Sequence, residues 1–274
     1  MNSLLRAGIA ELAGTFLLVL FGTGAVAAAV LTGAQTGLWQ VAVVWGFGVT
    51  LAIYASASAS GAHLNPAVTL SLALFRRETF PMGRIAPYWI AQLLGAVLAG
   101  AVVLAVFSPF IDRFNTEHSL VRGGPGSEAS AMVFGEYFPN PAIFGTDQAA
   151  YDLVSPVAAF GVEALGTAVL VFVIFALVES RNGAAPGALT PFFIGFTVAV
   201  LISLFAPITQ AGWNPARDFG PRIVAFLAGY GEIAIPGPRA GFWVYILGPF
   251  VGGLLGAMLY DFLLRPALAS TDPE

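Results

Sequence analysis

The tripeptide Asn-Pro-Ala occurs twice in this sequence, as Asn65-Pro66-Ala67 and as Asn214-Pro215-Ala216. Asparagine is a favoured N-cap and proline a favoured first helical residue, so each tripeptide predicts the start of a helix. An apolar stretch follows each start, at 66–75 and at 215–227. About ten residues of helix span roughly 15 Å, which is half of a ~30 Å hydrocarbon core. Each stretch is therefore predicted to be a re-entrant half-helix.

Two half-helices that meet N-terminus to N-terminus would repel cations and hydrated protons at their junction, because each helix dipole is positive at that end. Asn65 and Asn214 could turn side-chain amides toward a passing oxygen. The backbone carbonyls before them, in Gly61-Ala62-His63 and Gln210-Ala211-Gly212, could form a ladder of acceptors. This arrangement suits a neutral solute with hydroxyl groups, and it does not suit an ion.

The composition indicates that these segments lie in a membrane. Of the 274 residues, 58% are hydrophobic and 9% are charged, whereas a soluble domain has about 25% charged residues. Six segments are apolar and long enough to span a bilayer: 6–32, 39–59, 84–107, 157–178, 189–207 and 241–263. The chain has no cysteine and no basic tract. We therefore expect no metal, no cofactor and no nucleic-acid partner.

The two halves of the chain repeat each other. Glu11-x-x-Gly14-Thr15 recurs as Glu163-x-x-Gly166-Thr167, and each half contains three spans with a half-helix after the second. Because three is odd, the halves must enter the membrane in opposite directions. The predicted fold is an all-α membrane protein, with six transmembrane helices and two re-entrant half-helices forming one pore per chain.

The predicted domain organisation is a single channel domain over 1–274. Its inverted repeats cover approximately 1–107 and 155–267, and a long extracellular or periplasmic loop at 108–154 joins them. This loop is expected to be the main water-facing surface. The arginine bias places both termini in the cytoplasm of a multi-pass cell (inner) membrane protein surrounded by the lipid bilayer. The cytoplasmic arginines would be Arg6, Arg76, Arg77, Arg84, Arg181 and Arg265.

Four polar side chains allow more than one interpretation. Glu11 and Glu163 could relay protons, but their symmetric placement favours braces that accept hydrogen bonds from the two re-entrant loops. His63 could line the pore or fix the loop geometry. An arginine at membrane depth costs roughly 2.5–3.5 kcal/mol on insertion scales, so Arg217 is expected to be functional rather than a structural partner of Asp218.

The motifs at 61–69 and 214–221 resemble the paired signature loops of the aquaporin superfamily (major intrinsic proteins), and the resemblance covers nearly the whole chain. Asp218 directly after Arg217, together with the long loop, resembles the bacterial glycerol facilitators, or aquaglyceroporins. This resemblance implies a homotetramer. It also implies a narrow outer constriction formed by aromatic residues and one arginine, which here are Trp45 and Arg217.

Two filter positions depart from the glycerol facilitators. Ala211 stands where they have phenylalanine, and Ile202 stands where they have glycine and water channels have histidine. The resulting selectivity filter, formed by Trp45, Ile202, Ala211 and Arg217, is closer to that of the plant nodulin-26-like channels. Trp213, just before the second Asn, is also unusual for the family.

The resemblance implies a passive channel for glycerol, water and other small neutral solutes that excludes ions and protons. A water-selective pore is the main alternative, although a water filter would be expected to have a second polar group opposite the arginine. A secondary transporter is another alternative, because transporters also use inverted repeats and broken helices. With two histidines, no cysteine and no evident nucleophile–base pair, the chain is not expected to be an enzyme.

Overall fold

The computed structural model describes residues 3–268, and within that range it contains helices and no strand. Six helical stretches there are long and apolar enough to cross a membrane. They are built on α1 (Ser3–Thr32), α2 (Leu38–Ser60), α4 (Ile85–Glu117), α8 (Pro156–Val178), α9 (Thr190–Thr209) and α11 (Val244–Leu259). The fold prediction of an all-helical membrane protein is confirmed.

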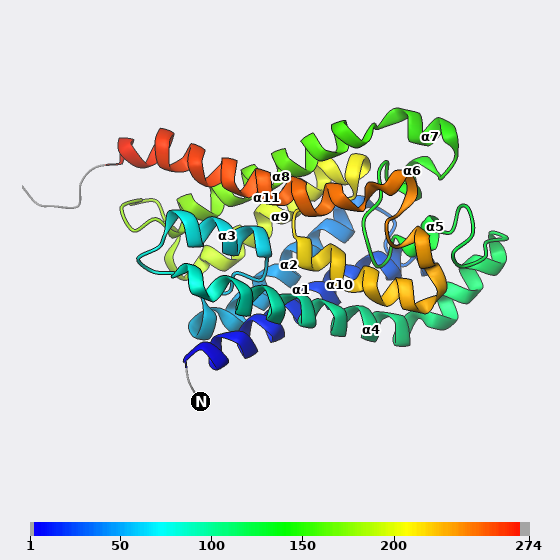
Figure 1. Ribbon diagram of the computed structural model, residues 1–274, viewed down its shortest axis with the longest axis horizontal. Coiled ribbons are helices and arrows are strands. Elements are labelled where there is room, and N and C mark those ends of the chain that lie inside the picture. The colour runs from blue at the N-terminus through cyan, green and yellow to red at the C-terminus, as the bar shows by residue number, and fades with distance from the viewer. Residues whose placement is uncertain (1–2, 269–274) are drawn as a thin grey trace, which may run out of the picture.

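Two short helices lie where the sequence predicts the two half-helices. They are α3 (Pro66–Phe75) and α10 (Pro215–Ala225). Each begins at the proline of an Asn-Pro-Ala tripeptide, with the asparagine as its N-cap. Figure 1 shows them in opposite halves of the long axis, with α3 toward the end that holds both ends of the described chain. The second half-helix ends as an α-helix at Ala225, two residues before the predicted limit.

The two halves have equivalent packing and interlock. In the first half α1 packs on α2 and α4, and in the second half α8 packs on α9 and α11. The half-helices cross over between them: α3 packs on α11 and α10 packs on α4. The halves also meet where α2 crosses α9, at Gly46 and Gly195. A Cβ on either glycine would collide with backbone of the other helix.

Shorter helical segments connect or extend these elements. The connecting loop carries α5 (Glu128–Ala131), α6 (Pro141–Phe144) and α7 (Gln148–Leu153). The remaining turns are η1 (Met82–Arg84), η2 (Gly187–Leu189), η3 (Phe226–Tyr230), η4 (Gly231–Ile233), η5 (Pro238–Trp243), η6 (Tyr260–Leu264) and η7 (Arg265–Ala267).

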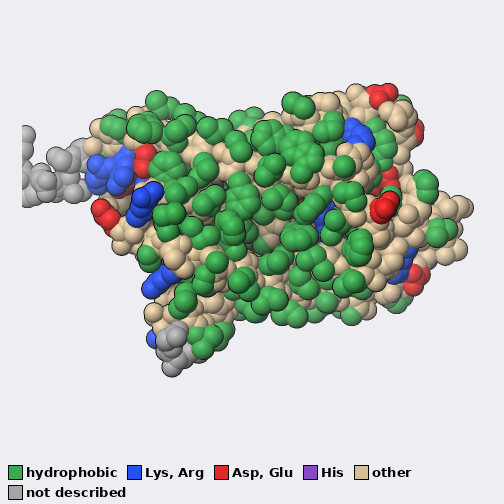
Figure 2. All heavy atoms as spheres, in the orientation of Figure 1, with side chains coloured by type: hydrophobic (Ala, Val, Ile, Leu, Met, Phe, Trp, Pro, Cys, Tyr) green, Lys and Arg blue, Asp and Glu red, His purple; other side chains and the backbone are tan. Residues whose placement is uncertain are grey.

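The outer surface has the pattern of a membrane protein. Hydrophobic side chains cover the middle of the face in Figure 2, and charged side chains gather toward its two ends. Large apolar side chains such as Phe47, Leu98 and Leu165 are exposed on three different long helices. Exposed apolar area on this scale is stable only against a partner that is itself apolar. The chain is therefore a multi-pass membrane protein.

The connecting loop begins later than predicted, and part of it is buried. Helix α4 continues to Glu117, ten residues beyond the expected end of that span at 107, and it includes Pro109. Many residues of the loop are exposed, but Val133, Phe134 and Tyr137 are buried. These apolar side chains fold inward and join a core cluster with α1 and α4. This part of the loop therefore packs onto the helices.

Candidate functional site

The two Asn-Pro-Ala loops meet and hold each other. The side chain of Asn65 accepts a hydrogen bond from Ala67 N (2.9 Å), and that of Asn214 accepts one from Ala216 N (3.1 Å). The amide of Asn65 donates to Trp213 O (2.9 Å), and the amide of Asn214 donates to Leu64 O (2.8 Å). Each asparagine therefore caps its own half-helix and also ties it to the opposite loop.

Glu11 and Glu163 bind the backbone of the two loops. Glu11 accepts hydrogen bonds from the backbone N–H groups of His63 (2.9 Å) and Leu64 (2.8 Å). Glu163 accepts them from Gly212 N (3.0 Å) and Trp213 N (2.8 Å). Both carboxyl groups are fully buried. This geometry favours braces over proton relays, because the oxygens are occupied by fixed donors.

The Glu-x-x-Gly spacing that both brace motifs share also has a steric reason. A Cβ on Gly14 would lie 2.5 Å from the Leu64 side chain, and a Cβ on Gly166 would collide with the Trp213 indole. Leu64 and Trp213 both have positive φ, at 53° and 42°, a conformation that is unfavourable for such residues. In each motif the Glu therefore holds a strained backbone, while the Gly leaves space for the side chain before the asparagine.

Two neighbouring cavities share part of their lining, and the place where they meet is called the constriction below. One has a volume of about 340 Å³ and is lined by both capping asparagines and by mostly apolar side chains. The other, of about 290 Å³, lies toward the connecting loop. Trp45, Ile202 and Arg217 line both cavities, whereas Ala211 lines only the first. The structure thus brings the four predicted filter residues to one place, with three of them at the junction of the cavities.

The arginine of this constriction is held on two sides. Its guanidinium carbon lies 4.4 Å from the ring centroid of Trp45, within the range of a cation–π interaction. It also forms an ion pair with the carboxylate of Glu136, a residue of the connecting loop. Arg217 and Glu136 are both buried. Sequence analysis missed Glu136, although a lone acidic residue within the otherwise uncharged run 129–146 was a usable signal.

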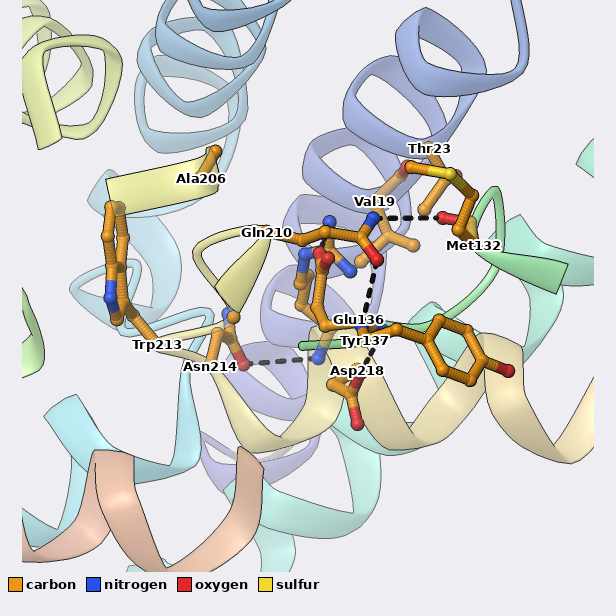
Figure 3. A network of polar contacts seen from close by, with 12 residues as sticks. Val19, Thr23, Met132, Glu136, Tyr137, Ala206, Gln210, Trp213, Asn214 and Asp218 are labelled. Carbon is orange, nitrogen blue, oxygen red and sulfur yellow. Dashed lines mark hydrogen bonds and ion pairs between the residues drawn. The ribbon is translucent and has the colours of Figure 1, made fainter. Parts of the chain in front are cut away.

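The connecting loop is fixed beside the constriction by polar contacts, shown in Figure 3. The backbone N–H of Glu136 donates to Asp218 Oδ1 (2.7 Å), and that of Tyr137 donates to Gln210 Oε1 (2.8 Å). Asp218 also accepts a hydrogen bond from Arg222 Nε (2.7 Å). Asp218 therefore pairs with Arg222 rather than with its neighbour Arg217, and it positions the loop.

The residues of the predicted carbonyl ladder are divided between the two cavities. Gly61, Ala62 and His63 line the larger cavity together with Ala211 and Gly212. Gln210 instead lines the cavity toward the loop, where its side chain binds loop backbone. The predicted ladder residues thus line both cavities.

The ring of His63 packs against Phe80 and Tyr88, with centroid distances of 4.4 and 4.9 Å. Its Nδ1 lies 3.3 Å from Thr69 Oγ1. These contacts favour a structural role for the imidazole. Among residues 3–268, no three or more His, Cys, Asp or Glu side chains are grouped to hold a metal ion.

Comparison with known proteins agrees with this geometry. The chain is 44% identical to a glycerol uptake facilitator protein of Haemophilus influenzae, over 92% of this chain and 91% of that protein. It is 38% identical to a propanediol uptake facilitator of Citrobacter freundii, over 96% of this chain and 94% of that protein. An aquaglyceroporin structure from Plasmodium falciparum superposes with a TM-score of 0.82 at 28% identity, covering 97% of this chain and 98% of that one.

The model of the family described as "Major intrinsic protein" matches residues 1–260, which is nearly the full length of the chain. Together with the paired half-helices and the constriction, this match shows that the chain belongs to the major intrinsic protein family.

Proposed function

We propose that this protein is a passive membrane channel for glycerol, water and other small neutral solutes. The observation that carries the proposal is the pair of cavities that share Trp45, Ile202 and Arg217 where two opposed half-helices meet. The names of its relatives, glycerol and propanediol uptake facilitators, support a small polyol as the solute. Their description as facilitators also supports transport rather than catalysis.

The constriction has two chemically different sides. Trp45 and Ile202 present apolar surface, which suits the carbon edge of a polyol. Arg217 presents N–H donors, which suit its hydroxyl oxygens. Ala211 adds little bulk where a larger side chain would narrow the path. We infer that a polyol passes with its carbon atoms against Trp45 and its hydroxyl groups toward Arg217.

Ion exclusion follows from the junction of the half-helices. The N-termini of α3 and α10 both direct positive dipole ends toward it, so a cation there would be repelled. Each capping amide has two N–H donors. One of them donates to the opposite loop, which leaves the other to bind a neutral oxygen. A neutral solute therefore has partners on this path, and a cation or hydrated proton does not.

The two alternative functions are less well supported. In the larger cavity most lining side chains are apolar, which favours a polyol path over a strictly water-selective one. A secondary transporter coupled to ions needs cation ligands or titratable groups that can change partners. Here Glu11 and Glu163 both bind backbone N–H groups of the re-entrant loops, so neither is free for that role.

We further propose an inner-membrane location with both termini in the cytoplasm. Arg76 pairs with Asp261, and both Arg181 and Arg265 pair with Glu179. These three arginines therefore gather beside the last residues that the structure describes. An arginine-rich end is typical of the cytoplasmic side. A homotetramer, and repeat halves at approximately 1–107 and 155–267 within one channel domain, remain part of this proposal.

The test is stopped-flow light scattering on proteoliposomes containing the purified chain. Glycerol and water gradients should relax much faster than in empty liposomes, without saturation and without dependence on a proton or sodium gradient. A pH-sensitive dye inside the same vesicles should report no added proton flux. Proteoliposomes that relax no faster than empty ones in glycerol, or that conduct protons, would overturn the proposed function.

A further inference from the structure

Trp213 is the large aromatic side chain of the second re-entrant loop, and it is not part of the constriction. It lines the larger cavity beside Asn65 and Asn214, but it does not line the cavity toward the connecting loop. Figure 3 shows its indole on the side of Asn214 that is away from Glu136 of the connecting loop. Trp213 therefore borders the path at the junction of the half-helices, and a solute meets it separately from the constriction.

The backbone and the indole of Trp213 are both fixed. Its N–H donates to Glu163 (2.8 Å), and its carbonyl accepts a hydrogen bond from the amide of Asn65 (2.9 Å). A Cβ on Gly166 would lie 2.1 Å from the indole nitrogen, so the ring lies directly against α8. Phe205 packs on the ring in a T-shaped geometry, with a centroid distance of 6.5 Å. The indole therefore cannot move aside for a solute without disturbing these contacts.

The equivalent residue of the first loop is Leu64, which also lines the larger cavity. Leu64 and Trp213 belong to the same buried apolar cluster as Leu170, which lines this cavity too. The leucine is smaller and more flexible than the indole. Near the constriction the second loop contributes only the methyl group of Ala211. The bulk of the second loop thus lies at the junction and not at the constriction.

We propose that Trp213 is a further specificity-determining residue, which limits the width of the polyols that can pass the junction of the half-helices. This inference rests on the proposed function, because it assumes that polyols pass the two asparagines. A polyol that binds an asparagine amide through a hydroxyl group must place its carbon atoms against the apolar wall that contains Leu64 and Trp213. The rigid side of that wall is the indole.

The physical reason is the cost of overpacking. Close-packed interiors resist even one additional methylene group, and a rigid side chain relieves less of the strain than a flexible one. A linear polyol passes the junction one carbon at a time, so its length matters little there. A branched polyol presents several carbon atoms to the junction at once. Its width should therefore be limited by the residue that yields least, which is Trp213.

The experiment compares Trp213→Leu with the wild type in proteoliposomes, using gradients of glycerol, ribitol and pentaerythritol. Ribitol is longer than glycerol but linear, whereas pentaerythritol carries hydroxymethyl groups on every side of one carbon. Trp213→Leu should raise the pentaerythritol-to-glycerol permeability ratio roughly tenfold, the scale of relieved overpacking expressed as a rate. The ribitol-to-glycerol ratio should change much less. Trp213→Phe, which keeps a smaller flat ring, should give an intermediate rise.

The matched control is Trp243→Leu. Trp243 lines neither cavity and stacks on Phe160 at a centroid distance of 5.6 Å, so this variant should keep the wild-type ratios. Thermal unfolding in detergent shows which variants are folded. If Trp213→Leu does not fold, Trp213→Phe carries the test.

An unchanged pentaerythritol ratio in a folded Trp213 variant would overturn the inference. An equal rise for ribitol, or the same rise in Trp243→Leu, would overturn it as well, because neither is an effect of width at the junction. If the wild type itself passes no glycerol, the proposed function fails instead, so the two failures are distinguishable.

Discussion

The two re-entrant loops have similar backbones but different surroundings. The first, at 61–65, is held by side chains of its own half. Besides two backbone N–H groups of the loop, Glu11 accepts hydrogen bonds from Ser60 Oγ (2.7 Å) and Gln92 Nε2 (2.8 Å). The second, at 210–214, is tied outward to the connecting loop through Gln210. The contacts that both loops share form the junction of the half-helices, and the contacts that only the second loop makes form the constriction. Selectivity therefore depends on what surrounds the second loop.

The largest expected effect comes from removing the braces. Glu11→Leu and Glu163→Leu each leave buried N–H groups unpaired, at a cost of roughly 1–3 kcal/mol per group. Glu11 accepts from four groups of the protein and Glu163 from the two backbone N–H groups of its loop, so Glu11→Leu should destabilise the fold more. Thermal unfolding of the detergent-solubilised variants measures this. Equal decreases in the unfolding temperature of the two variants would contradict this difference between the loops.

The next largest effect concerns the glycine that packs against each re-entrant loop. Gly166→Ala would collide with the rigid indole of Trp213, whereas Gly14→Ala meets the flexible tip of Leu64 and Ser56. Overpacking costs typically 1–3 kcal/mol, and a flexible side chain relieves part of it. Gly166→Ala should therefore lower the unfolding temperature more than Gly14→Ala. Trp213→Leu should rescue it, and a failure of that rescue would contradict the steric explanation.

Equivalent positions after the two Asn-Pro-Ala tripeptides test whether selectivity depends on the second loop. Arg217 follows Asn214-Pro215-Ala216, and Val68 is its counterpart after the first tripeptide. Arg217→Ala and Trp45→Ala should each change the glycerol-to-water permeability ratio severalfold, because they remove the polar and apolar sides of the constriction. Val68→Ala should leave the ratio close to that of the wild type. Liposome swelling measures all three, and unchanged ratios in both filter variants would remove the filter assignment.

The smallest expected effect is a dependence on pH. Burial raises the pKa of Glu136 to about 8. Its carboxylate is therefore ionised above that pH and becomes protonated as the pH falls, which weakens the ion pair with Arg217. Water permeability of the wild type should decline severalfold between roughly pH 9 and pH 6, and that of Glu136→Gln should stay flat. A parallel decline in both would assign the titration to another group.

Much of the fold was predictable because membrane helices follow from local composition. The six spans, the half-helix starts at Pro66 and Pro215, and the repeat of the Glu-x-x-Gly motif all follow from short-range patterns. The constriction around Trp45 and Arg217 was predictable only through resemblance to a family. Contacts between distant segments were not predictable. The uncharged run 129–146 marks Glu136 as unusual, but it does not indicate that Glu136 reaches Arg217, because that position depends on how a long loop packs.

The end of α4 shows a similar limit. Pro109 and the polar residues after it indicate that the span stops near 107, yet the helix continues to Glu117. Part of this extension is held by tertiary packing, since Ile111 and Asn115 are buried. Tertiary contacts overrode the local signal, as they often do for helix ends.

The exchange of half-helices between the repeats has a consequence for biogenesis. Helix α3 packs mainly on α11, the last long helix to be synthesised, and the amide of Asn65 bonds to the carbonyl of Trp213. The N-terminal repeat must therefore wait in the bilayer, with its re-entrant segment held only by contacts within its own half, until almost the entire chain has left the ribosome. Neither repeat expressed alone should form a stable unit, and two separate fragments should recover a channel only when they are inserted together.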